Sequence, residues 1–166
     1  MMERYCYQSP LGWMTLICSE GALVQIDFEE TKPKNVSDFS KSPLIQDVLR
    51  WLTGYFRGEV PTVTPRLAPA GTPFQRAVWN ELQAIPYGET RSYGDLAHVL
   101  ARKLRKPRLS AQAVGRAVGS NPITLIIPCH RVIGANGALT GYRWGLERKA
   151  NLLAFEKLTR SNALGE

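Results

Sequence analysis

The chain has 166 residues, 44% of them hydrophobic and 9% aromatic, which is enough for one ordinary domain or for a small and a medium domain. No apolar run approaches the roughly 18 residues of a membrane-spanning helix, and the first residues lack a secretory layout, so we expect a cytoplasmic or nucleoid protein. Residues 1–72 carry 7 basic and 8 acidic side chains and residues 73–166 carry 14 and 6, an asymmetry that fits a polyanionic partner or a merely basic surface.

The first part of the chain predicts a strand ribbon followed by one helix. Residues 3–28 hold three β-rich runs separated by turns at 9–12 and 19–21. Residues 29–42 are polar and predict a surface loop. Residues 44–56 place apolar side chains at helical spacing and predict a helix.

A proline-punctuated stretch, residues 61–69, predicts a link to a second part. There Thr72 is suited to cap a helix, Pro73 to its first position, and Gln75 to the reciprocal capping contact. The sequence therefore predicts a helix over residues 73–84.

Two short helices are expected next, and a basic connector joins them. Ser92 caps the first helix, and Ser110 caps the second, residues 111–118, which is rich in alanine and glycine. The basic connector, residues 102–108, has five basic side chains and no acidic one. This pattern matches a helix-turn-helix whose small second helix can approach DNA. Spacing alone leaves an ordinary helical hairpin open, and the basic connector favours DNA.

The end of the chain predicts a buried strand, a loop and a last helix. Residues 123–127 are apolar and end at a proline, and the glycine-rich residues 134–141 predict a loop. The last helix is expected over 146–158, with Lys149 and Glu156 on a largely apolar stripe. A carboxylate on such a stripe needs a partner, because an unpaired buried charge is costly.

The chain contains three cysteines and two histidines. An odd number of cysteines without a signal segment favours reduced thiols, and two histidines with no Cys-x-x-Cys pair argue against a zinc site. Cys6 and Cys18 lie in strand-like runs and are expected in the core.

Cys129 stands between Pro128 and His130, where the expected buried strand ends. Thiolate is the nucleophilic form of cysteine, and a neighbouring base or cation lowers the thiol pKa. Glu156 on the last helix is available to orient His130, so a Cys–His–Glu relay can form. A small buried cysteine beside a surface histidine is the alternative that the residues leave open.

The segment Pro128-Cys129-His130-Arg131-Val132-Ile133-Gly134, preceded by Asn121-Pro122, resembles the signature of O6-methylguanine-DNA methyltransferases, also called methylated-DNA–protein-cysteine methyltransferases or alkylguanine-DNA alkyltransferases. The resemblance covers nearly the whole chain. Other segments similar to the family are residues 9–12, 71–79, 85–93, 113–115, 141–145 and 148–156.

The resemblance implies an α+β fold in two domains. Residues 1–68 would form a small antiparallel-sheet (ribonuclease H-like) domain with its linker. Residues 69–166 would form a mostly helical winged helix-turn-helix domain that carries the active cysteine. The implied partner is double-stranded DNA containing O6-alkylguanine, and O4-alkylthymine as well. No cofactor, metal or membrane is implied, and the chain is expected to be a monomer, with cooperative assembly on DNA left open.

The implied reaction is irreversible transfer of the alkyl group to Cys129 after the base is flipped out of the helix. His130 would take the thiol proton through a water, and Glu156 would hold His130. Tyr93 is similar to the tyrosine that donates a proton or hydrogen bond to the leaving guanine. Asn121 matches a residue that braces the active-site turn.

The resemblance also implies binding residues around Cys129 and on the second short helix. Substrate-binding residues would be Pro128, Val132, Tyr142 and Lys149. DNA-binding residues would be Ser92, Arg108, Gln112, Ala113, Gly115, Arg116 and Val118.

The chain departs from the family pattern at Gln112. The family usually has an arginine there, which fills the gap left by the flipped base, and its connector is shorter and less basic. We expect Gln112 to weaken duplex engagement without abolishing transfer, with Arg116 or Arg108 as compensating charges.

Three other functions compete with this interpretation. A binding-only relative would lack the cysteine, so the presence of Cys129 argues against this function. A winged-helix transcription regulator needs no Pro-Cys-His segment and usually has a further domain. A cysteine hydrolase generally takes its cysteine and histidine from separate segments, unlike Cys129 and His130.

Overall fold

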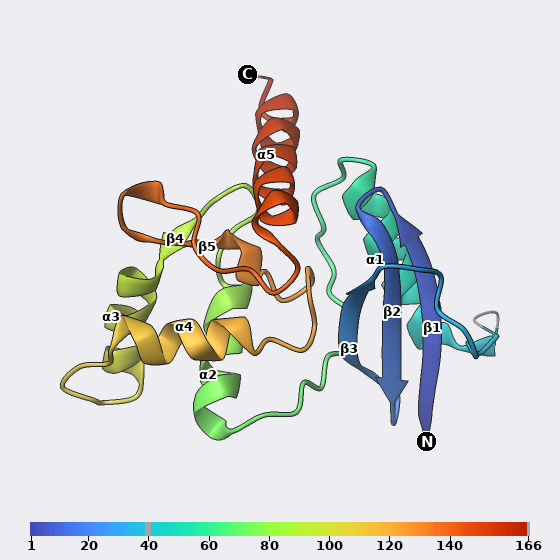
Figure 1. The fold of residues 1–166 in the computed structure, drawn as a ribbon, viewed down its shortest axis with the longest axis horizontal. Helices are drawn as coiled ribbons and strands as arrows, with labels where there is room; N and C mark the ends of the chain where they lie inside the picture. Colours follow the sequence, from blue (N-terminus) through green and yellow to red (C-terminus); the bar gives the residue numbers. More distant parts are fainter. Residues whose placement is uncertain (39–40, 166) are drawn as a thin grey trace. The chain divides into compact units, whose positions relative to one another are not determined.

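The computed structural model describes residues 1–38 and 41–165 and divides into two compact units (Figure 1). Residues 1–70 with 122–124 form the first unit, and the remaining described residues form the second. The first unit contains a three-stranded antiparallel sheet and the second is mostly helical, which confirms the expected α+β class. None of the helices among the described residues is long and apolar enough to cross a membrane.

The sheet of the first unit has its strands in sequence order: β1 (Met2–Ser9), β2 (Gly12–Ser19) and β3 (Ala22–Glu29). Tyr5, Leu16 and Ile26 are register partners across the three strands, and all three are buried. Cys18 is buried as predicted, but Cys6 is partly exposed and its core placement was wrong. The reason is the alternation of a strand, which turns Cys6 to the face opposite its neighbour Tyr5.

Helix α1 (Pro43–Phe56) confirms the predicted helix of the first unit. It begins where the Ser42 hydroxyl accepts a hydrogen bond from the backbone N–H of Ile45. Ile45, Val48 and Leu52 recur at three- and four-residue spacing and are fully buried. Each such burial stabilises the unit by about 1.5–3 kcal/mol. Residues 39 and 40 of the predicted surface loop lie outside the described residues.

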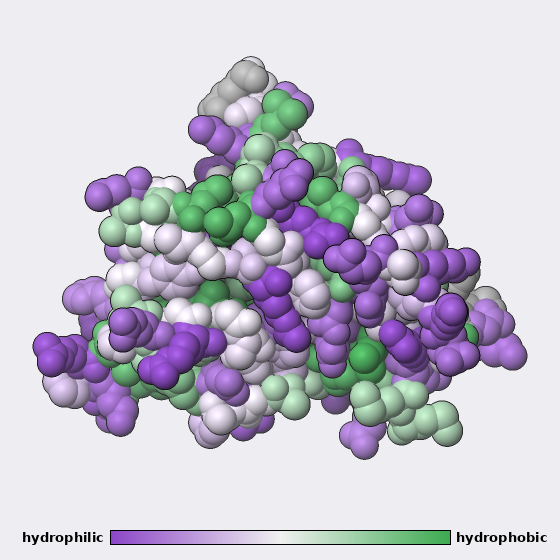
Figure 2. Space-filling view, viewed as in Figure 1, coloured by the Kyte–Doolittle hydropathy of each residue, from purple (hydrophilic) through white to green (hydrophobic). Residues whose placement is uncertain are grey.

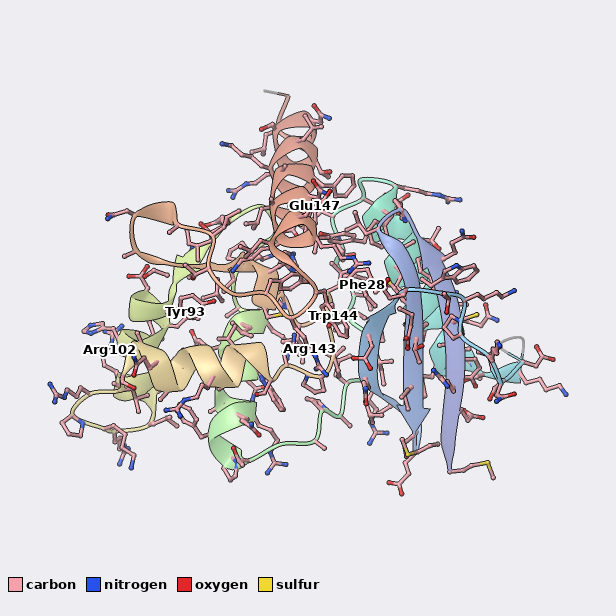
Figure 3. All side chains as sticks on the ribbon, in the orientation of Figure 1. Phe28, Tyr93, Arg102, Arg143, Trp144 and Glu147 are labelled. Atoms are coloured by element: carbon pink, nitrogen blue, oxygen red, sulfur yellow. The ribbon has the colours of Figure 1, made fainter. Side chains whose placement is uncertain are left out.

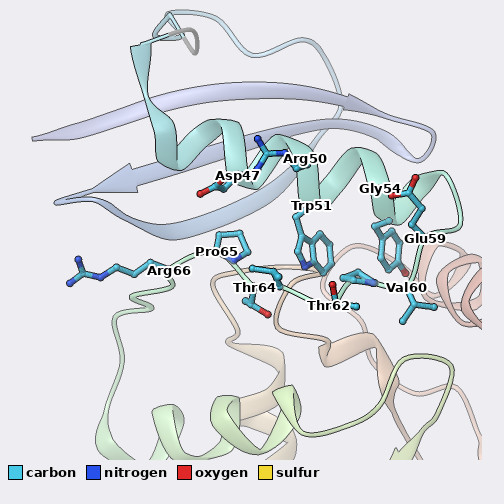
Figure 4. A pocket seen from close by; sticks show the side chains of 13 residues that line it. Asp47, Arg50, Trp51, Gly54, Glu59, Val60, Thr62, Thr64, Pro65 and Arg66 are labelled. Atoms are coloured by element: carbon cyan, nitrogen blue, oxygen red, sulfur yellow. Dashed lines mark hydrogen bonds and ion pairs between the residues drawn. The ribbon is translucent and has the colours of Figure 1, made fainter.

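The proline-punctuated link follows the edge of the sheet. The Leu23 N–H donates to the Arg66 carbonyl and the Ala68 N–H donates to the Leu23 carbonyl, both at 2.9 Å. A hollow of about 390 Å³ lies between α1 and residues 59–66, with Trp51 on its wall (Figure 4). It is lined by none of the residues expected at the functional site.

The second unit contains four α-helices and two short parallel strands: α2 (Pro73–Gln83), β4 (Arg91–Ser92), α3 (Tyr93–Lys103), α4 (Ala111–Gly119), β5 (Val132–Ile133) and α5 (Leu146–Ala163). The predicted caps are present, because Thr72 with Gln75 and Ser92 with Asp95 form reciprocal capping boxes. The Trp79 indole donates to the Ala117 carbonyl of α4 at 2.8 Å and ties α2 to α4.

Two predicted elements differ from the structure. Residues 123–127 are buried but form isolated bridges and no strand, because Leu125 adopts a left-handed φ of 75° and turns the backbone within the segment. The last helix continues beyond residue 158 to Ala163, since nothing in its sequence interrupts it there.

Candidate active site

Cys129 begins a short 3-10 turn (η2, Cys129–Arg131) that is held by the backbone around it. The Asn121 side-chain amide and the Cys129 N–H both donate to the Ile127 carbonyl, each at 2.8 Å. The Cys129 carbonyl in turn accepts the N–H of Val132. The turn therefore leads directly into β5, which pairs in parallel with β4 and brings Tyr93, the first residue of α3, to the same region.

Glu156 is a fully buried carboxylate that accepts hydrogen bonds from several donors. Its Oε2 lies 2.6 Å from His130 Nε2 and 3.2 Å from Arg131 Nη2. Its Oε1 accepts from Arg131 Nε at 2.7 Å and from the Gly88 N–H at 3.2 Å. The buried carboxylate therefore has the partner that the sequence required, and His130, Arg131 and Gly88 share this role. Burial alone would raise the pKa of Glu156, but His130 and Arg131 outweigh it and hold that pKa well below its usual range.

The ionised Glu156 determines the tautomer of His130. A carboxylate can only accept hydrogen bonds, so Nε2 of His130 carries the hydrogen that points to Glu156. Neutral imidazole then has a bare lone pair on Nδ1. Nδ1 is buried and makes no hydrogen bond within the described residues. The arrangement presents a base whose accepting atom is available for an outside partner.

The Cys129 thiol is not an activated thiolate in this state. Burial raises its pKa, and a hydrogen bond from Asn121 with the charges of Lys149 and Arg143 offsets only part of that rise. The neighbouring cations do lower the thiol pKa, but burial outweighs them. A protonated thiol needs a base to become a nucleophile.

Tyr93 and Lys149 share one backbone carbonyl. The Tyr93 hydroxyl donates to the Thr140 carbonyl at 3.3 Å, and Lys149 Nζ donates to the Thr140 and Gly141 carbonyls at 3.0 and 3.2 Å. Burial lowers the pKa of Lys149 and raises that of Tyr93. Lys149 therefore anchors the loop beside Cys129, and the Tyr93 hydroxyl is already engaged.

The other predicted substrate-binding residues lie near the same turn. Pro128 and Val132 are buried next to Cys129 in the chain. The Tyr142 hydroxyl is buried without a hydrogen-bond partner among the described residues, and burial raises its pKa well above the usual value. Unpaired buried polar groups are uncommon in proteins, so Tyr142 and His130 mark a place that can receive a polar ligand.

Helix α4 presents one polar face and buries the other. Gln112 and Arg116 are exposed one turn apart, and Ala113 and Gly115 are half-buried. Val118, expected at the DNA surface, is instead in the core, where it continues an apolar stripe of this short helix. The other two predicted DNA contacts lie outside the helix: Ser92 caps α3 and Arg108 is exposed in the basic connector.

Comparison with known proteins identifies the family. The model of the 6-O-methylguanine DNA methyltransferase DNA binding domain matches residues 73–158, and that of the ribonuclease-like domain of the same proteins matches residues 2–69. The chain belongs to this family. Its DNA-binding domain makes DNA the partner of the second unit.

Several methyltransferases are similar to the chain over nearly its whole length. The methylated-DNA–protein-cysteine methyltransferase of Methanosarcina acetivorans is 44% identical over 90% of this chain and 95% of that protein. The Haemophilus influenzae protein of the same name is 40% identical over 92% and 84%. A crystal structure of a Mycobacterium tuberculosis homologue in complex with DNA has a TM-score of 0.79 at 40% identity and covers 93% of this chain and 92% of its own.

Within this methyltransferase site, sequence reasoning missed Arg131 and Gly88. Arg131 donates to both oxygens of Glu156 and to the Ile85 carbonyl at 2.9 Å, so it fixes the carboxylate that holds His130. A signal for Arg131 was available in the sequence. A buried Glu156 needs a cationic partner, and Arg131 is the cation in the signature segment. Gly88 left no comparable signal, because its role is a backbone N–H.

Gly88→Ala is expected to destabilise the second unit by about 1–3 kcal/mol. Gly88 has a left-handed φ of 78°, and an added Cβ would lie 2.8 Å from Arg160 Cδ and 3.3 Å from the Glu156 carbonyl oxygen. Chemical unfolding measures the effect. The matched control is Gly94→Ala in α3, whose added Cβ meets only Ser92 Oγ at 3.8 Å. Equal stability of the two variants would contradict the strain at Gly88.

Proposed function

We propose that this chain repairs DNA by direct reversal, moving the alkyl group of O6-alkylguanine onto Cys129 in a single turnover. The observation that carries the proposal is the buried contact of 2.6 Å between Glu156 and His130 Nε2, one residue after the thiol. This contact leaves His130 Nδ1 available as a base, next in the chain to a cysteine thiol that must lose its proton to react. Membership of the methyltransferase family supports the same conclusion.

The transfer is a direct displacement at the alkyl carbon. His130 Nδ1 takes the Cys129 proton through a bridging water, and the sulfur attacks the alkyl carbon as the bond from carbon to O6 breaks. The leaving guanine gains one proton, so the proton lost by the thiol ends on the guanine. The thioether on Cys129 has no good leaving group, so each molecule reacts once. The target base must leave the helical stack, because a side chain cannot reach this atom within it.

Tyr93 serves the leaving group in this scheme. Its hydroxyl donates to the Thr140 carbonyl before DNA binds, so the incoming base must replace that carbonyl as acceptor. A hydrogen bond that forms to charge developing on the guanine stabilises the transition state more than the ground state. Tyr142, Val132 and Lys149 would line the pocket that holds the base.

Tyr93→Phe is expected to slow alkyl transfer on the order of 100-fold. The fold should survive, because phenylalanine keeps the aromatic ring of Tyr93 that packs beside Gly115. A Cβ added at Gly115 would lie 3.6 Å from this ring. Single-turnover rates at saturating duplex measure the effect, and unfolding measurements provide the control. An unchanged rate at saturation would remove Tyr93 from the reaction.

The polar face of α4 would enter the DNA. Gln112 occupies the second position of the helix and Arg116 follows one turn later, so both can reach the same groove. Gln112 can insert into the stack and hydrogen-bond there, but it brings no charge to the phosphates.

Gln112→Arg is therefore expected to increase duplex affinity and to steepen its dependence on salt by about one phosphate contact. Titration of alkylated duplex at several salt concentrations measures this change. The control is Gln83→Arg, which adds the same charge at an exposed position of α2. A gain in duplex affinity no larger than that of the control would contradict the prediction that Gln112 limits binding to the duplex.

The stoichiometry of the reaction tests the proposed function. Mixed with excess methylated duplex, the protein should restore one guanine per chain and then stop, as expected of a monomer that acts once. Continued turnover would indicate a hydrolase. Because the proposed substrate is DNA, we expect the protein in the cytoplasm, with the nucleoid.

A further inference from the structure

The basic connector, residues 102–108, carries the highest density of positive charge in the chain. Lys103 is neutralised by Glu81 at 2.6 Å. The other four cations are exposed and form no ion pair within the part of the chain that the structure describes: Arg102, Arg105, Lys106 and Arg108. Figure 2 shows hydrophilic side chains gathered over the C-terminal end of α3, and Figure 3 labels Arg102 at this end.

The connector is an ordered turn. The Leu104 N–H donates to the Leu100 carbonyl and the Lys106 N–H to the Ala101 carbonyl, both at 2.8 Å. Arg105 has a left-handed φ of 53° at the end of α3, a position that usually takes glycine or asparagine. A charged residue is thus held in a disfavoured backbone conformation, and such strain is concentrated at functional positions.

Three features select the partner that this surface fits. The four cations repel one another, so they favour a partner with closely spaced negative charge, as in a phosphate backbone. Leu104 in the connector and Leu109 just after it are half-buried, so this surface offers no large apolar side chain for insertion into a lipid surface. The connector leads directly into α4, in the domain whose family binds DNA.

We propose that the connector is a lesion-independent anchor that binds the phosphates of duplex DNA outside the base pocket. Phosphate contacts position a protein on DNA without reading its bases, so the anchor holds damaged and undamaged duplex equally well. It loads the protein onto DNA and makes up for the uncharged Gln112, while the chemistry at Cys129 is unaffected. The proposal rests on the proposed function only for the identity of the partner.

The test compares two variants that each lose three positive charges. The first is R102Q/R105N/K106Q, in which asparagine suits the left-handed backbone. The control is K34Q/R57Q/K157Q, three exposed residues outside the connector. Affinity for methylated and for undamaged duplex is measured at several salt concentrations, and the transfer rate is measured at saturating methylated duplex. Thermal unfolding verifies that both variants are folded.

The connector variant should lose affinity for both duplexes by the same factor, and the slope of log affinity against log salt should fall by about 2 to 3 relative to the control. Its transfer rate at saturation should equal that of the parent. A slope equal to that of the control would overturn the proposal. So would a loss confined to methylated duplex, or a slower transfer at saturation. A parent that binds DNA with a steep salt dependence but never methylates Cys129 would instead refute the proposed function alone.

Discussion

Glu156→Gln is expected to slow alkyl transfer by about 100-fold or more, because the base that deprotonates Cys129 loses its charged partner. The amide oxygen of glutamine can still accept the His130 hydrogen. It cannot stabilise the imidazolium that forms when His130 takes the thiol proton. Single-turnover transfer measured over a range of pH reads the effect. A variant that keeps the parent rate would remove the relay from the mechanism.

The same substitution should change how stability depends on pH. The pKa of Glu156 in the folded protein lies well below its ordinary value of 4.5. A depressed carboxyl pKa adds stability that is fully present above the unfolded value and is lost as pH falls through the folded one. The parent should therefore be clearly more stable than Glu156→Gln at neutral pH, and the gap should narrow as pH falls below 4.5. A gap that is constant with pH would contradict the buried carboxylate.

Arg131→Met is expected to destabilise the protein by about 3–5 kcal/mol, because it leaves a buried carboxylate without its main cation. Arg131 donates to both oxygens of Glu156 and is itself buried. Chemical unfolding at neutral pH measures the loss. A loss of less than about 1 kcal/mol would show that the pair is solvated in solution.

The double variant Arg131→Met/Glu156→Gln separates structure from chemistry. With both charges gone, no buried ion is left unpaired, so much of the stability lost in Arg131→Met should return. Transfer should stay slow, because His130 still lacks a carboxylate. Recovery of the transfer rate together with stability would mean that Arg131 and Glu156 are only structural.

Local sequence signals were sufficient for most of the fold. Thr72 with Gln75 three positions later, and Ser92 as a capping residue, predicted two helix starts that the structure shows. Residues 123–127 misled because apolar composition reports burial and not conformation. The turn there depends on the backbone of Leu125, which has no signature in its side chain. Cys6 was misplaced because a run of apolar residues does not say which face of the sheet is covered.

The candidate site was predictable where chemistry resides in side chains. Cys129, His130 and Glu156 were named from the signature segment, and the structure brings the last two within 2.6 Å. Contacts made by backbone atoms escaped prediction, such as the Gly88 N–H on Glu156 and the Thr140 carbonyl that occupies Tyr93. The direction of the Cys129 pKa shift also escaped, because it depends on how far the fold buries the thiol.

The mass of the peptide that contains Cys129 tests directly whether the alkyl group is transferred to this cysteine. The protein is incubated with duplex containing O6-methylguanine, digested and weighed, with undamaged duplex as the control. We expect one added methyl group on the Cys129 peptide and none on the peptides of Cys6 and Cys18. An unmodified Cys129 in a protein shown to bind the methylated duplex would contradict it.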